Sequence, residues 1–110
     1  KLLAGASWEG EYGNPDVAAE RAYIAAYSPY QALKRGAHYP APFIYASTRD
    51  DRVHPGHARK FGARLAALKS PYYFYEETEG GHSVGADPAQ QAKHYALEFA
   101  YLARLLMDGK

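Results

Sequence analysis

The residues whose types and spacing could do chemistry lie in two polar loops, and each loop follows a short apolar stretch. Asp50 follows the stretch at 43–46, and His82 ends the loop after the stretch at 72–75. A carboxylate beside an imidazole holds the ring in one tautomer and stabilises its cation, which allows the ring to take a proton from a serine hydroxyl. The pattern therefore predicts an acid–histidine pair for nucleophilic catalysis, with Gly80 and Gly81 giving the backbone freedom to place the histidine.

The elements that must position these loops alternate between helices and strands. The pattern predicts a loop over 1–16, a helix from a cap at Asp16 to about Tyr27, a short turn or helix at Ser28-Pro29, strands at 43–46 and 72–75, and helices beginning at Pro55 and Pro88. Strands that alternate with helices form a parallel sheet covered by helices. Parallel strands end at one edge of the sheet, so Asp50 and His82 are expected to meet there.

The last predicted helix has an apolar face, which we expect to pack in the core. Asp87 is positioned to cap this helix, and Lys93 and Arg104 are expected on its solvated face. The apolar face consists of Ala92, Tyr95, Phe99, Leu102 and Leu106. The acidic run at 76–79 is expected to be solvated.

Only two clear strands are predicted, and a two-stranded parallel sheet buries little surface and leaves two open edges. We therefore expect residues 1–110 to be one part of a larger α/β domain. The unpaired edge would be covered by the missing part of that domain, or by a second copy of the chain in a homo-oligomer.

Composition excludes several classes of function. The chain has 110 residues, 47% of them hydrophobic and 23% charged, which is typical of a globular protein. The net charge of +1 gives no electrostatic case for nucleic acid or an anionic membrane, and no apolar run is long enough to cross a bilayer. Cysteine is absent, and His54 and His57 lack a third ligand, so no metal or other cofactor is expected.

Four motifs together resemble the end of the catalytic domain of the prolyl oligopeptidase family. They are Ala6-Ser7-Trp8-Glu9-Gly10-Glu11-Tyr12-Gly13, Tyr27-Ser28-Pro29-Tyr30, Asp50-Asp51-Arg52-Val53 and Gly81-His82. The resemblance runs from Ala4 to Leu106. It implies the C-terminal portion of an α/β-hydrolase fold, with parallel strands flanked by helices. It also implies a serine peptidase that hydrolyses short peptides after proline by a Ser-Asp-His triad.

The resemblance assigns roles to individual residues. Asp50 would be the acid of the triad and His82 the general base. Arg52 would donate to a carbonyl of the bound peptide, and Trp8 would stack on the proline ring of the substrate. The remaining residues that the resemblance places in this pocket are Tyr12 and Val53. For Asp51 an ion pair with Arg49 or Arg52 is the simpler interpretation.

The sequence departs from the family in one large respect, because no serine in it lies at the place of the family's nucleophile. In the family that serine precedes the Trp8 region, so it is expected to lie before Lys1. The β-propeller that limits the family to short peptides is absent as well. The isolated chain is therefore expected to be inactive.

Two other functions remain open. An acylaminoacyl-peptidase, a dipeptidyl-peptidase or an esterase on the same fold would share the Asp50 and His82 loops, although Trp8 favours cleavage after proline. Alternatively, the chain is a non-catalytic piece that associates with itself or with a partner.

Overall fold

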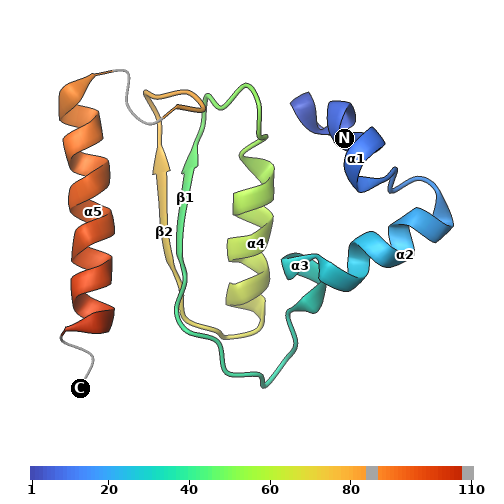
Figure 1. Cartoon of the computed structure of the whole chain (residues 1–110). Coiled ribbons are helices and arrows are strands. Elements are labelled where there is room, and N and C mark those ends of the chain that lie inside the picture. The colour runs from blue at the N-terminus through green and yellow to red at the C-terminus, as the bar shows by residue number, and fades with distance from the viewer. Residues whose placement is uncertain (84–86, 108–110) are drawn as a thin grey trace.

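The computed structural model describes residues 1–83 and 87–107, which form two strands and several helices (Figure 1). In chain order the elements are a 3₁₀ helix η1 (Leu3–Trp8), α1 (Glu9–Tyr12), α2 (Ala18–Tyr27), α3 (Pro29–Ala32), β1 (Phe43–Ser47), α4 (Gly56–Ala67), β2 (Tyr73–Glu77) and α5 (Pro88–Leu106). The strands are parallel and in register, from Phe43 opposite Tyr73 to Ser47 opposite Glu77. The predicted order of strand, helix, strand and helix is thus present.

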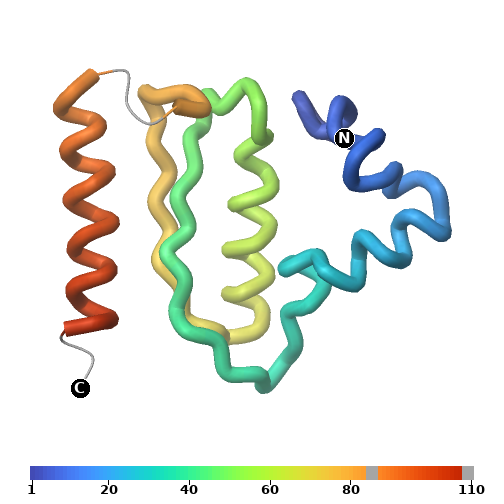
Figure 2. Tube along the Cα trace, viewed as in Figure 1, coloured from blue at the N-terminus to red at the C-terminus, as the bar shows by residue number. Residues whose placement is uncertain are grey.

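The two strands lie between α4 and α5, as the chain trace in Figure 2 also shows. Alternate side chains of a strand point to opposite faces of a sheet. On one face, Tyr101 of α5 contacts the rings of Phe43 and Tyr73, with ring centroids 5.6 and 5.8 Å apart. On the other face, the ring of Phe74 lies close to Gly62 of α4, where an added Cβ would approach it to 3.3 Å. Both faces of the sheet are therefore covered by helices.

The N-terminal segment differs from the prediction of a loop, because it contains η1 and α1. The next helix also begins differently. Val17 is the residue before α2, and the carboxylate of Asp16 lies 2.6 Å from the ammonium of Lys1 instead of capping the helix. The predicted cap of α5 is confirmed, because Asp87 accepts hydrogen bonds from the N–H groups of Ala89 and Gln90 at 2.8 and 2.9 Å.

The apolar face predicted for α5 does not pack in the core of this chain. Phe99 is 67% exposed and Leu106 is 79% exposed, and Tyr95 and Leu102 are exposed as well. The side of the helix that meets the sheet carries His94 and Tyr101. The prediction was wrong because a sheet of two strands offers the helix only enough surface for one side of it.

The chain is more open than a compact protein of its length. Its radius of gyration is 16.2 Å, whereas about 13 Å is typical for this number of residues. Leu33 and Leu65 are the buried large hydrophobic residues among those described, at 7% and 1% exposure. Leu65 belongs to α4, so the packing that fixes the sheet is concentrated around the strands and α4.

Among residues 1–83 and 87–107, no helix combines the length and apolarity needed to span a membrane.

Candidate active site

The side chains of Asp50 and His82 meet beyond the C-terminal ends of β1 and β2. His82 Nδ1 lies 3.0 Å from each of the two carboxylate oxygens of Asp50. The Asp50 side chain is 14% exposed, and that of His82 is 40% exposed. The expected contact is present, and it leaves the histidine ring accessible from solvent while the acid is largely covered.

The Asp50 carboxylate is fixed by its own loop. Its Oδ1 accepts hydrogen bonds from the backbone N–H groups of Arg52 at 2.9 Å and Val53 at 2.8 Å. An aspartate that binds the backbone two and three residues further on stabilises a tight turn. The turn therefore holds the carboxylate in the orientation in which it meets His82.

The same contacts set the charge of Asp50. Burial raises the pKa of this carboxyl, but the hydrogen bonds from the Val53 N–H, from His82 and from the Arg52 N–H together lower it below its usual value. Asp50 is therefore ionised at neutral pH and can only accept hydrogen bonds. It follows that His82 donates through Nδ1, which leaves the lone pair of Nε2 free to take a proton.

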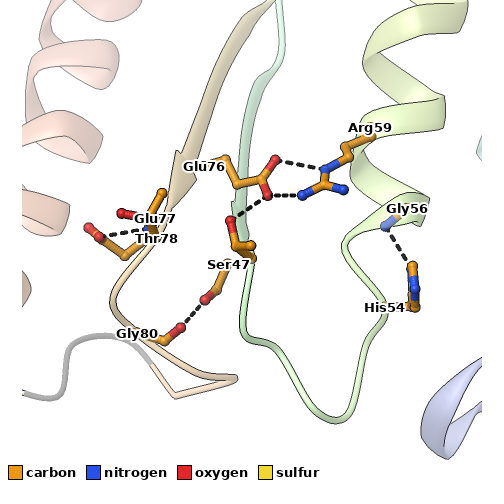
Figure 3. A network of polar contacts seen from close by, with 9 residues as sticks. Ser47, His54, Gly56, Arg59, Glu76, Glu77, Thr78 and Gly80 are labelled. Carbon is orange, nitrogen blue, oxygen red and sulfur yellow. Dashed lines mark hydrogen bonds and ion pairs between the residues drawn. The ribbon is translucent and has the colours of Figure 1, made fainter.

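Two hydrogen bonds connect the loop of Asp50 to the chain that leads to His82. The backbone N–H of Thr48 donates to the carbonyl of Glu77 at 2.8 Å, which extends the pairing of the strands by one step. Further on, the hydroxyl of Ser47 donates to the carbonyl of Gly80 (Figure 3). No motif in the sequence identifies Ser47, because its partner is 33 positions away along the chain.

The acidic run after β2 is not simply solvated, which corrects the sequence-based expectation. Glu76 accepts hydrogen bonds from Arg59 of α4 (Figure 3) and from the hydroxyl of Thr48. These two donors, Arg59 first, lower the pKa of Glu76 to about 2. Glu77 is 8% exposed, and its carboxylate accepts from the N–H groups of Thr78 and Glu79. Glu77 thus fixes the start of the loop that leads to His82, whereas Glu76 joins β2 to α4 and to the residue after β1.

Trp8 and Tyr12 form a second group of predicted site residues. Their ring centroids are 5.9 Å apart, and each side chain is about half exposed, at 52% and 51%. They line a cavity of about 360 Å³. The other residues around this cavity are Lys1, Gly5, Glu9, Gly13, Pro15 and Ile24. An open cavity of this kind, lined by aromatic, aliphatic and charged side chains, has room for a small ring.

Arg52 and Val53 do not line the cavity beside Trp8, although Val53 was expected to share a pocket with it. Their loop touches the first helical turn through one hydrogen bond, from the Ala4 N–H to the Arg52 carbonyl at 3.3 Å. Both side chains are exposed. The structure therefore brings the six predicted site residues together as two groups joined by that contact.

The ion pairs weighed for Asp51 are not formed among the described residues. Instead, Nη1 of Arg49 lies 3.8 Å from Oε2 of Glu79, and both of these side chains are largely exposed. The guanidinium of Arg52 has no acidic partner in this part of the chain. It is therefore available to a ligand.

The structure gives no metal-binding arrangement in residues 1–83 and 87–107, where no three side chains of suitable type converge. His54 uses Nδ1 to accept the N–H of Gly56 at 3.0 Å (Figure 3). A hydroxyl nucleophile is also missing from the contacts of His82 in these residues. The hydroxyl of Ser7 donates to the carbonyl of Ala4, and the hydroxyl of Ser47 donates to the carbonyl of Gly80.

The parallel strands flanked by helices, with the acid–histidine contact at their edge, form part of an α/β-hydrolase fold. A model of the prolyl oligopeptidase family matches residues 2–109. The chain belongs to the prolyl oligopeptidase family.

Individual relatives support the same assignment. The uncharacterized peptidase y4nA of Sinorhizobium fredii is 47% identical over 110 residues, which is 100% of this chain and 15% of that protein. A prolyl endopeptidase of Elizabethkingia miricola is 39% identical over 82% of this chain and 13% of its own length. A solved structure from a study of two prolyl endopeptidases is similar to this chain, with a TM-score of 0.82 and 30% sequence identity. The match covers 98% of this chain and 16% of the other chain. The chain thus spans less than a fifth of the length of these proteins.

Proposed function

We propose that the protein containing this chain is a serine peptidase that hydrolyses short peptides after proline, with Asp50 as the acid and His82 as the base of a Ser-Asp-His triad. The observation that carries the proposal is the 3.0 Å contact between His82 Nδ1 and the Asp50 carboxylate. In a neutral imidazole that contact places the ring proton on Nδ1 and the lone pair on Nε2, which is the arrangement a general base requires.

In the proposed mechanism, Nε2 of His82 takes the proton of a serine hydroxyl as the serine oxygen attacks the scissile carbonyl. Asp50 stabilises the imidazolium that results. The imidazolium then returns the proton to the leaving amine, which completes an acyl-enzyme, and His82 next activates the water that hydrolyses it. Asp50 stays ionised throughout, which agrees with its lowered pKa.

The nucleophile is proposed to come from outside these 110 residues. The one Gly-x-Ser-x-Gly pattern in the sequence, at 81–85, contains the proposed base His82 and follows the proposed acid, whereas the nucleophile of an α/β-hydrolase precedes both in the chain order Ser…Asp…His. The relatives are several times longer than this chain. The missing segment would also supply the oxyanion donor that follows the serine. On this proposal the 110-residue chain alone does not hydrolyse peptides.

The preference for proline is proposed to rest on Trp8 and Arg52. The indole of Trp8 is half exposed above an open cavity, so a pyrrolidine ring could stack on it and lose contact with water. The free guanidinium of Arg52 could donate to a carbonyl of the bound peptide and fix its register. Tyr12 and Val53 would border the bound proline once substrate and the rest of the protein are in place.

The substrate preference is tested with fluorogenic peptides on the full-length protein. We expect kcat/KM to be at least about tenfold higher for a peptide with proline before the scissile bond than for its alanine counterpart, because the alanine lacks the ring that Trp8 would contact. The matched measurement uses Trp8→Ala, which should reduce this ratio. A higher kcat/KM for alanine or for acyl-amino substrates in the native protein would instead support the other peptidases of the fold.

The partners are proposed to be the peptide substrate and the missing N-terminal part of the same domain. The chain exposes 7951 Å², whereas a compact monomer of its size would expose about 6,100 Å². The outer face of α5 and the open edges of the two-stranded sheet contribute apolar surface and unpaired backbone groups. In the isolated chain, a second copy could cover the same edge.

We expect the isolated 110-residue chain to bind a dye for exposed apolar surface and to elute from size-exclusion chromatography above its monomer mass. The reason is that exposed apolar side chains and open strands favour association. The full-length protein serves as the comparison and should bind much less dye per mole. Elution of the isolated chain as a dye-negative monomer would contradict the proposal that it is one part of a domain.

A further inference from the structure

We propose that Ser47 is a positioning residue, which fixes the loop of His82 against the loop of Asp50 through its hydrogen bond to Gly80. This inference rests on the proposed function, because it concerns how the two members of the triad are held in register. Neither the resemblance of the motifs nor the pairing of the strands assigns a role to this serine.

The bond joins the two loops at a buried point close to both side chains. Ser47 is the last residue of β1 and is 6% exposed, and its hydroxyl donates to the carbonyl of Gly80, which is buried too (Figure 3). The backbone carbonyl of Ser47 also accepts the backbone N–H of Asp50 at 3.3 Å. Gly80 lies two residues before His82. One residue therefore contacts the backbone on both sides of the acid–histidine pair, through its hydroxyl on the side of His82 and through its carbonyl on the side of Asp50.

Other contacts between the loops cannot replace this bond. The ion pair between Arg49 and Glu79 spans 3.8 Å, with side chains 67% and 63% exposed, so water and salt screen it. The hydrogen bond from Thr48 to Glu77 fixes the strands before the loops diverge. Without the Ser47 hydroxyl, the contact between Asp50 and His82 would itself have to hold the loops together.

The chemistry of the bond makes its loss consequential. A buried carbonyl that loses its donor remains unsatisfied, and the chain moves to find another donor or water. Movement at Gly80 shifts the backbone of His82 relative to Asp50. Because a misplacement of about 1 Å can slow an enzymatic step by as much as about 100-fold, a small shift of this loop is enough to reduce turnover.

The test compares Ser47 variants of the full-length protein, with kcat expressed per active site titrated by a fluorophosphonate. We expect Ser47→Ala to lower kcat about tenfold and to change KM less than about twofold, since the loss is one of alignment and not of substrate contact. Ser47→Thr, which keeps the hydroxyl, should restore most of kcat. Ser47→Cys keeps the volume but offers only a weak donor, so it should resemble Ser47→Ala.

Thr48→Val is the matched control, because it removes a side-chain hydrogen bond from the residue after β1 to Glu76 of β2 and leaves the bond from Ser47 to Gly80 in place. Its kcat should stay within about twofold of the native value. A native kcat in Ser47→Cys, or an equal loss in Thr48→Val, overturns the inference. If Ser47→Ala does not fold, the comparison of Ser47→Cys with Ser47→Thr decides the matter.

The proposed function can fail separately from this inference. If His82→Ala leaves turnover unchanged, the triad assignment is wrong, and the role of Ser47 falls with it. If His82→Ala abolishes turnover while the Ser47 variants keep the native kcat, only the positioning role is wrong.

Discussion

Replacing His82 by alanine in the full-length protein is expected to lower kcat by about 10⁶-fold, the size of loss measured when a triad histidine is removed from a serine peptidase. In the proposed mechanism no other group can take the proton of the nucleophile. Among the described residues the Asp50 carboxylate contacts His82, its own turn and no hydroxyl. The measurement is single-turnover hydrolysis of a proline-containing fluorogenic peptide.

His38→Ala provides the matched control, because His38 is another exposed histidine and lies in the connector before β1. It should keep native turnover. The side chain of His82 is 40% exposed, so its removal should leave the thermal unfolding temperature close to that of the native protein. A His82→Ala variant that retains turnover would rule out His82 as the base.

The fold was predictable from local sequence because the relevant signals are local. Short aromatic stretches indicate the strands, and Asp87 followed by Pro88 marks the start of α5, whose cap is confirmed. The start of α2 was not predictable in the same way. Asp16 has the right type and place for a cap, but Lys1 competes for its carboxylate from 15 residues earlier in the chain, at 2.6 Å.

The acid–histidine contact was predictable because parallel strands end at one edge of a sheet, so residues just beyond two such ends meet. The contacts that support it depend on the register of the strands instead. Ser47 meets Gly80 only because Ser47 pairs with Glu77. Glu76 is drawn out of solvent by Arg59, which belongs to α4. No spacing along the chain identifies these partners.

The outward face of α5 shows where an amphipathic pattern becomes ambiguous. The sequence carries apolar side chains on that face, and the helix also presents His94 and Tyr101 to the sheet. A helix that is apolar on more than one side is stable when other elements cover it on more than one side. The two-stranded sheet covers one of them, which is why the periodicity identified an apolar face but not the one that contacts β1 and β2.

Replacing Asp50 by asparagine is expected to lower kcat by about 10⁴-fold, the effect seen for this exchange in a serine peptidase triad. Asparagine has the same shape, and its carbonyl oxygen can still accept the N–H groups of Arg52 and Val53. Its other terminal group is an amide, which donates where the carboxylate accepted. His82 Nδ1 must then accept, so the ring proton moves to Nε2 and the base is lost.

Asp51→Asn is the control for this prediction, because it makes the same chemical change one residue away, on an exposed side chain that forms no ion pair among the described residues. It should leave kcat within about twofold of the native value. The comparison shows which of the two neighbouring carboxylates is needed for turnover. If Asp51→Asn caused the larger loss, the triad acid would be Asp51, and the turn that holds Asp50 would serve only to shape the loop.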